Sequence, residues 1–113
     1  MKAILQRVTF AEVKVDGNTV GKIDNGFLIL LGVAEGDTEK EADALSSKIA
    51  TLRVFTDEND KMNLSLEDVG GSMLVISQFT LYGDCSHGRR PYFGNAMEPV
   101  SANEMYEKFV AYI

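Results

Sequence analysis

Ser77, Gln78 and Thr80 bring two hydroxyls and an amide to the point where the apolar run 73–76 ends. An uninterrupted apolar run of this length indicates a strand that is covered on both faces. Binding residues often lie in the loop directly after a rigid strand, and these polar residues, with Gly83 in the loop beyond them, occupy that position. These side chains could bind a ligand or, if a base stood beside them, act as nucleophiles.

A base for either hydroxyl is hard to find in this sequence. A serine-hydrolase triad needs a histidine, and the single one, His87, lies in a Gly-containing loop with no G-x-S-x-G pattern around either hydroxyl. Cys85 and His87 could form a thiol dyad, but no pattern places Cys85 at a helix N-terminus, where the pKa of its thiol would fall. We therefore expect neither a side-chain triad nor a reactive thiol.

Two groups of arginines leave alternatives open. The basic loop 87–91 contains Gly88, Arg89 and Arg90, and it is either a solvated turn or a site for a phosphate or carboxylate. Arg7 lies within the expected first strand, where its charge must reach solvent or find a partner. Exposure to solvent is the interpretation that we favour for Arg7.

Composition and charge limit the classes of function. The chain has 113 residues, 45% of them hydrophobic and 25% charged, which predicts one globular domain spanning residues 1–113. The net charge is -6, and residues 35–69 carry ten Asp/Glu against four Lys/Arg. A protein that binds long nucleic acid normally has a basic face, so we expect contact with a few nucleotides at most.

Several other classes are not expected. No apolar run reaches the ~20 residues of a membrane helix, and the N-terminus has no signal-peptide core, so we expect a cytoplasmic protein without a membrane segment. One Cys and one His cannot form a disulfide or a structural zinc site, and the acidic turn 57–60 lacks EF-hand spacing. We expect no metal and no cofactor.

The pattern of apolar residues predicts the elements that carry these side chains. Residues 1–15 form two short strands, and a turn at residues 16–18 makes a hairpin with the next strand. The most apolar run, residues 27–33, is expected to be the central strand. Short strands are also predicted at residues 53–55 and 62–64, around the acidic turn.

Two amphipathic helices are predicted from capping boxes. Thr38 and Glu41 start the first, and Ser101 and Glu104 start the second. The buried stripes are expected at Ala42, Leu45, Ile49 and Leu52 in the first helix and at Met105, Phe109 and Tyr112 in the second. The fold class that follows is α/β in the broad sense, a mixed α+β fold with largely antiparallel β-sheet layers and two helices packed on them.

Six motifs, in order along the chain, resemble those of the D-aminoacyl-tRNA deacylase family, also called D-tyrosyl-tRNA deacylase. They are Gln6-Arg7-Val8, Leu31-Gly32-Val33 with Gly36-Asp37-Thr38, Lys61-Met62-Asn63-Leu64, Val69-Gly70-Gly71, Ser77-Gln78-Phe79-Thr80-Leu81 and Gly88-Arg89-Arg90-Pro91-Tyr92-Phe93. The resemblance implies a deacylase-like fold and a cytoplasmic homodimeric hydrolase. Such an enzyme cleaves the ester between a D-amino acid and the terminal adenosine of tRNA.

The resemblance also implies roles for individual residues. Ser77, Gln78, Phe79 and Thr80 would line the pocket for the tRNA 3′ end, with the backbone amides of Phe79 and Thr80 as oxyanion donors. Ala102 would be a small wall residue. Catalysis would use a water and the hydroxyl of the RNA, without a side-chain base, a metal or a cofactor. Arg7 would have a supporting role.

One family motif has no counterpart in this sequence. The family's C-terminal loop contains a Gly-Pro pair that a partner subunit receives, whereas Pro91 and Pro99 both follow other residues. We therefore expect a chain that is C-terminally short relative to the family. The missing motif therefore keeps two alternatives to an active deacylase open. One is a non-catalytic module that binds the acylated tRNA end or adenosine, and the other is a structural fragment that is stable only as a dimer or oligomer. The sequence does not determine which amino acids are accepted or whether glycyl-tRNA is cleaved.

Overall fold

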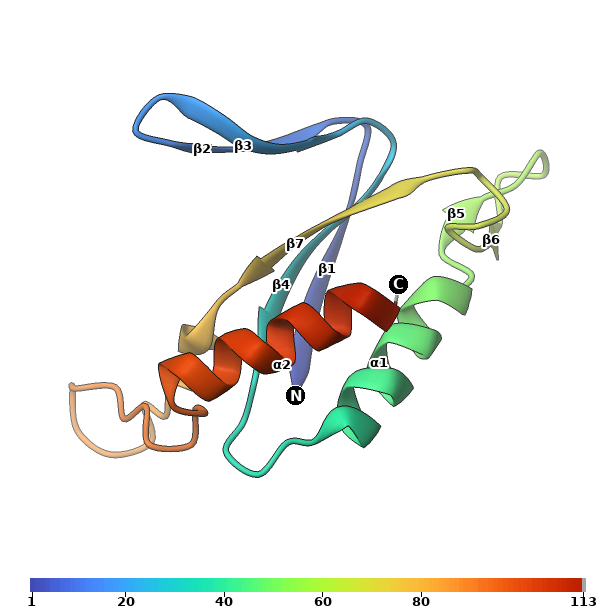
Figure 1. Cartoon of the computed structure of the whole chain (residues 1–113). Coiled ribbons are helices and arrows are strands. Elements are labelled where there is room, and N and C mark those ends of the chain that lie inside the picture. The colour runs from blue at the N-terminus through green and yellow to red at the C-terminus, as the bar shows by residue number, and fades with distance from the viewer. Residues whose placement is uncertain (113) are drawn as a thin grey trace.

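The computed structural model describes residues 1–112, and Figure 1 shows their arrangement. Seven strands, one 3-10 helix and two α-helices follow one another along these described residues. They are β1 (Lys2–Val8), β2 (Ala11–Val15), β3 (Asn18–Ile23), β4 (Gly26–Gly32), α1 (Glu39–Thr51), β5 (Phe55–Thr56), β6 (Met62–Leu64), β7 (Ser72–Ser77), η1 (Phe79–Tyr82) and α2 (Pro99–Tyr112).

The central sheet has the strand order β1-β4-β7. β4 pairs with β1 in the antiparallel sense and with β7 in the parallel sense, which confirms the predicted central strand and the mixed, largely antiparallel fold. Ile29 lies opposite both Leu5 and Val75 in the register, so these side chains share one face of the sheet. β7 is at the edge of the sheet, and Met73 to Ile76, which alternate between its two faces, are all half-buried. β3 and α2 both contact this strand, so the predicted cover on both faces is present but incomplete.

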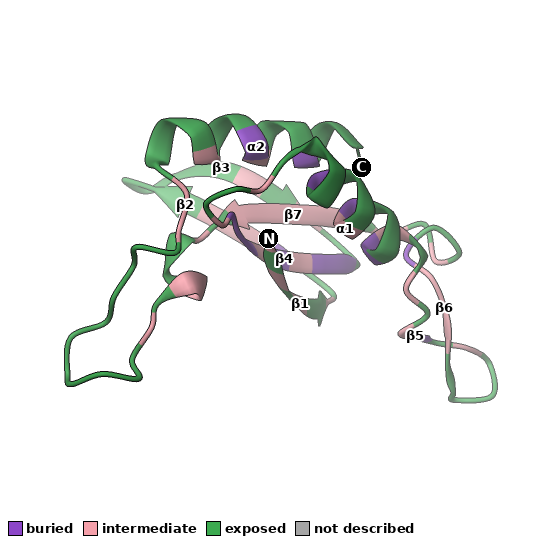
Figure 2. Ribbon diagram, turned by 90° about the horizontal axis from the view of Figure 1, so that it is seen from below, coloured by how far each residue is buried: buried purple, intermediate pink, exposed green. Residues whose placement is uncertain are grey.

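Both α-helices cover the same face of this sheet (Figure 1). Most buried residues of the core belong to β4 and to the inner faces of the helices, whose buried segments are purple in Figure 2, and Val33, Phe55 and Leu66 complete it. Phe27, Ile29 and Leu31 from β4 are at most 1% exposed, and Ile49 and Phe109 from the helices pack against them. A parallel connection such as that between β4 and β7 needs a crossover, which α1 and the β5–β6 segment provide.

The start of α1 was predicted correctly. The carboxylate of Glu41 accepts the backbone N–H of Thr38 at 2.8 Å and also the Thr38 hydroxyl at 2.5 Å. Ala42 and Ile49 are buried, while Leu45 and Leu52 are half-buried, so the predicted stripe faces the core.

The start of α2 was predicted wrongly. The helix begins at Pro99, two residues before the proposed cap Ser101, which lies inside the helix. Glu98 has the capping role, because its carboxylate accepts the backbone N–H groups of Val100 at 2.9 Å and Ser101 at 3.1 Å. Met105 and Phe109 are buried as predicted, whereas Tyr112 is 46% exposed.

The two small hairpins are confirmed with altered bounds. β2 and β3 pair across Asp16 and Gly17, whose φ values of 51° and 81° are those of a tight hairpin turn. β5 begins at Phe55, two residues later than predicted, because the side chain of Arg53 binds the carbonyl of Asn63 at 2.9 Å ahead of the strand. Within residues 1–112, no helix has the length and apolar character that a membrane-spanning segment requires.

Candidate functional site

The carboxyl end of β4 holds together the two chain segments that form the candidate site. The N–H of Gln78 donates to the carbonyl of Leu31 at 2.7 Å, which extends the pairing of β7 by one residue. On the other side, the N–H of Met97 donates to Val33 at 2.9 Å, and the N–H of Glu35 donates to Asn95 at 3.0 Å. These backbone contacts fix the segment after β7 and the segment before α2 on one rigid strand end.

The first of these segments turns from extended backbone into the 3-10 helix η1. Gln78 is extended, with φ -142° and ψ 94°, and Phe79 is the first helical residue. Gly32, at the end of β4, permits this close packing, because a Cβ there would lie 3.0 Å from the Cβ of Leu81. The sequence therefore places a glycine where η1 crosses the end of the central strand.

The amides of Phe79 and Thr80 are unpaired donors at the start of η1. The first N–H groups of a helix have no acceptor within the helix. Within residues 1–112 neither amide has a hydrogen-bond partner, while the carbonyl of Thr80 accepts the N–H of Gly83 at 3.0 Å. The two N–H groups are therefore free to bind an anionic oxygen from outside.

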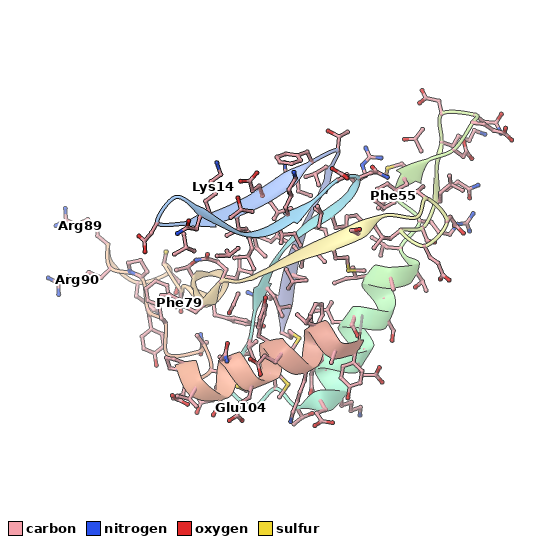
Figure 3. The ribbon with its side chains drawn as sticks, turned by 45° about the horizontal axis from the view of Figure 1, so that its top comes forward. Lys14, Phe55, Phe79, Arg89, Arg90 and Glu104 are labelled. Atoms are coloured by element: carbon pink, nitrogen blue, oxygen red, sulfur yellow. The ribbon has the colours of Figure 1, made fainter. Side chains whose placement is uncertain are left out.

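Phe93 forms an aromatic wall with Phe79. The two rings meet edge to face, with centroids 5.2 Å apart and an interplanar angle of 65°. Phe79 is 57% exposed and Phe93 is 36% exposed, so neither ring is a core residue. Figure 3 shows Phe79 beyond the end of β7, on the side of the molecule from which Arg89 and Arg90 project.

A cavity of about 450 Å³ lies between η1, the segment 93–98 and the first turns of α2. Its volume is within the range of roughly 300–1,000 Å³ that is typical of small-ligand sites. Its lining is mainly apolar and comprises Ser77, Phe79, Phe93, Ala96, Met97, Glu98, Pro99, Ala102 and Asn103.

Glu98 is the one carboxylate in this lining, and its geometry does not suit a general base. Its oxygens accept the N–H groups of Val100 and Ser101. These hydrogen bonds, that of Val100 first, hold the pKa of Glu98 below its ordinary value, and a weakly basic carboxylate accepts protons poorly. Glu98 therefore caps α2 and fixes the wall of the cavity.

The structure brings together part of the predicted site. Ser77, Phe79 and Ala102 line one cavity. Gln78 and Thr80 lie beside it with their side chains bound to each other, because the Gln78 amide donates to the Thr80 hydroxyl. Of Thr80, the backbone amide is thus the part that is left free.

Arg7 lies away from this cavity. It is opposite Phe27 in the register, whereas Ser77 is opposite Leu31, so the two are separated by four residues, or about 13 Å, along the sheet. The side chain of Arg7 is exposed and donates to the carbonyl of Val54 at 2.7 Å. Its charge therefore reaches solvent and also finds a partner on the segment before β5.

Other candidates from the sequence are not gathered into a site. Cys85 and His87 are both exposed in the loop beyond η1. Within residues 1–112, no three His, Cys, Asp or Glu side chains are grouped as metal ligands. The carboxylate of Asp57 in the acidic turn accepts the amides of Asn59 and Lys61, at 2.8 Å and 3.1 Å.

Sequence reasoning missed the wall that faces η1. Phe93, Met97 and Pro99 occur in a stretch without helical or strand periodicity, and backbone hydrogen bonds to the residues just after β4 place this stretch. One signal was available, because Phe93 ends one of the motifs quoted above. The arrangement as a whole provides an apolar slot, one hydroxyl and two free N–H donors, which suits a flat ring joined to a group that develops negative charge.

Comparison with known proteins identifies relatives along nearly the whole chain. A family model described as D-Tyr-tRNA(Tyr) deacylase matches residues 4–113. A D-aminoacyl-tRNA deacylase of Clostridioides difficile (strain 630) is 57% identical over 110 residues, which are 97% of this chain and 74% of that protein. A D-aminoacyl-tRNA deacylase of Desulfatibacillum aliphaticivorans is 59% identical over 110 residues, 97% of this chain and 75% of that protein.

Two solved structures share the fold. The structure of a c-Myc DNA unwinding element binding protein superposes with a TM-score of 0.92 at 40% identity and covers 98% of this chain and 74% of its own. That of a probable eukaryotic D-amino acid tRNA deacylase has a TM-score of 0.78 at 17% identity, with 97% of this chain and 64% of its own covered. The second likeness is evidence of the fold alone.

Proposed function

Because the chain belongs to the D-Tyr-tRNA(Tyr) deacylase family, we propose that it hydrolyses the ester of D-aminoacyl-tRNA and releases free tRNA and a D-amino acid. The observation that carries this proposal for the site is the cavity lined by Ser77, Phe79 and Ala102 beside two unpaired backbone amides. The terminal adenosine and the ester of the substrate occupy this cavity. Its apolar rings suit a nucleobase, because stacking of a base on an aromatic side chain is worth about 1–3 kcal/mol.

The chemistry follows from the free donors. Water adds to the ester carbonyl, and the developing oxyanion accepts the N–H groups of Phe79 and Thr80. The bond between the carbonyl carbon and the ribose oxygen then breaks, the ribose oxygen takes a proton, and the amino acid leaves with a carboxyl group. Each preorganised donor of this kind contributes about 3 kcal/mol to transition-state stabilisation.

A side-chain base is not needed in this scheme. An aminoacyl ester is an activated ester, and the hydroxyl of the terminal ribose next to it can relay the proton of the water. Ser77 supplies a hydroxyl at the cavity wall, and the hydrogen bond between the Gln78 and Thr80 side chains holds the start of η1 in place. The protein therefore acts by positioning and by electrostatic stabilisation.

Family membership also supports the finer assignments. The protein acts in the cytoplasm as a homodimer, in proofreading of chirality during translation, and binds the acylated 3′ end of tRNA. Arg7 supports the scaffold at the other end of the sheet, where its hydrogen bond to Val54 ties β1 to the segment before β5.

Ester loss from D-tyrosyl-tRNA and L-tyrosyl-tRNA tests the function directly. We expect hydrolysis of the D-ester above the buffer rate and little hydrolysis of the L-ester. No D-dependent hydrolysis would refute the activity. Calorimetric binding of the tRNA or of adenosine without turnover would instead support the non-catalytic module, which family membership does not favour.

A further inference from the structure

The loop after η1 is positively charged, in contrast to the acidic residues 35–69. Residues 85–97 contain Arg89 and Arg90 and no Asp or Glu, although the chain as a whole has a net charge of -6. Ten of the seventeen acidic residues lie in residues 35–69, which comprise the turn before α1, α1 itself and the chain from β5 to the turn before β7. An exposed basic loop is therefore present at one end of an acidic protein.

This basic loop, residues 85–91, is closed at its base. Asp84 and Tyr92 form an antiparallel bridge with two backbone hydrogen bonds of 2.7 Å and 2.8 Å. The carboxylate of Asp84 accepts the N–H of Ser86 at 2.9 Å, and Gly88, with a φ of 67°, turns the chain. The loop is exposed along its length (Figure 2), so its side chains are available to a ligand.

The two arginines of the basic loop differ from the other two of the chain. Arg7 and Arg53 each donate to a backbone carbonyl. Arg89 and Arg90 form no ion pair and no side-chain hydrogen bond within residues 1–112, and Figure 3 shows both side chains directed away from the body of the protein. Unpaired guanidinium groups side by side present donors with the geometry that binds phosphate.

The basic loop is also next to the cavity. Tyr92, at its base, directly precedes Phe93, which lines the cavity and contacts Phe79. Arg90 is three residues from Phe93, so their Cα atoms are at most about 11 Å apart. An arginine at this distance can therefore contact the phosphates that directly adjoin a nucleoside bound in the cavity.

We propose that Arg89 and Arg90 bind the backbone phosphates of the single-stranded 3′ end of tRNA, immediately upstream of the nucleoside in the cavity. This inference rests on the proposed function, since it concerns how the same substrate is held. Binding of phosphates carries no base specificity, and it opposes the repulsion between RNA and a protein of net negative charge. The basic loop thus recognises the nucleic-acid part of the substrate, while the cavity recognises the acylated nucleoside.

The test compares a substrate that has these phosphates with one that lacks them. The double variant R89A/R90A is assayed with D-tyrosyl-tRNA and with D-tyrosyl-adenosine over salt concentrations from about 50 to about 300 mM. The control K48A/K61A also removes two positive charges, from exposed lysines of α1 and the β5–β6 turn that have no ion-pair partner within residues 1–112.

We expect kcat/KM of R89A/R90A for D-tyrosyl-tRNA to fall about tenfold at low salt, mainly through KM, and to change less than twofold for D-tyrosyl-adenosine. Two lost phosphate contacts reduce the slope of log(kcat/KM) against log[salt] by about 1.4. Equal losses on both substrates, or a K48A/K61A effect as large, would overturn the proposal.

Two further outcomes separate the possible failures. If the unmodified protein hydrolyses neither substrate, the proposed function fails. If it hydrolyses both and R89A/R90A does so equally well, the activity stands and only the phosphate contact is refuted. A change in sedimentation of R89A/R90A, with an unchanged salt slope, would assign the basic loop to a protein–protein contact and also overturn the proposal.

Discussion

Replacement of Phe79 by proline tests whether its backbone amide stabilises the transition state. Proline removes the N–H, and the backbone can accommodate the ring. Gln78 is extended, as the residue before a proline prefers, and Phe79 is the first residue of η1, where a fixed φ near -65° matches 3-10 geometry. Since the Phe79 N–H has no partner within residues 1–112, its removal breaks no hydrogen bond of the fold.

The matched control is Phe79→Ala, which removes the same aromatic ring and keeps the N–H. Both variants lose the edge-to-face contact with Phe93, worth about 0.5–1.5 kcal/mol, and the stacking surface for the base. The difference between them isolates the amide. One oxyanion donor is typically worth about 10²–10³ in kcat, so we expect Phe79→Pro to be slower than Phe79→Ala by about that factor.

The assay is single-turnover hydrolysis of D-tyrosyl-tRNA at saturating enzyme, with urea unfolding of both variants in parallel. We expect free energies of unfolding within about 1 kcal/mol of each other, because a proline at this position costs little. If both variants are folded and their rate constants agree within about threefold, the amide is not an oxyanion donor and the mechanism proposed above is wrong.

Three more substitutions test the remaining parts of the site and its support. Thr80→Ala keeps the backbone amide, so we expect less than a tenfold loss of kcat, and a loss as complete as that of a catalytic nucleophile would contradict the mechanism. Ala102→Leu places a larger side chain in the cavity wall and should raise KM for D-tyrosyl-tRNA at least tenfold with little change in unfolding, as measured by steady-state kinetics and thermal melts. Because Val100 and Ser101 lower the pKa of Glu98 in the folded state, its cap stabilises above the ordinary carboxyl pKa of 4.5 and is lost as the pH falls through the lowered value. Urea unfolding at several pH values should therefore show Glu98→Ala less stable than the unmodified protein at pH 7 and equal to it in strong acid, and a constant difference would exclude the cap.

Local sequence patterns correctly predicted the elements whose formation depends on residues close together in the chain. The run 27–33 is apolar throughout because one face of β4 is buried and the other, with Leu28 and Leu30, is half-buried, and Thr38 with Glu41 forms the start of α1 from residues three apart in sequence. The start of α2 was missed because a Ser-x-x-Glu pattern occurs inside the helix, while the actual cap is the carboxylate of Glu98, one residue before Pro99. Both Glu98-Pro99 and the Ser101-x-x-Glu104 pattern are compatible with a helix start, and only the folded structure shows which of them begins α2.

The sequence indicated one wall of the candidate cavity and not the other. Ser77 and Phe79 belong to one contiguous motif, which a reader of the sequence can find. The opposite wall is held by long-range backbone hydrogen bonds, such as that from the N–H of Met97 to the carbonyl of Val33. Every residue except proline has the same backbone donor and acceptor, so such bonds cannot be recognised from residue types in the sequence. For the same reason the sequence did not show that Arg7 would lie at the other end of the sheet from Ser77.

Among the strands of residues 1–112, the one parallel pairing, β4 with β7, determines where this site lies. Because the two strands run in the same direction, their carboxyl ends meet at one edge, so η1 and the loop after Val33 emerge side by side. In an antiparallel pairing, Ser77 would instead emerge at the edge where Arg7 lies, away from Val33 and Glu35, whose backbone groups hold the segment before α2. The edge of the sheet beyond the strand ends is also where open α/β sheets bind ligands. The topology therefore brings the free amides, the apolar cavity and the basic loop to the same end of the molecule, where an RNA end can contact all three.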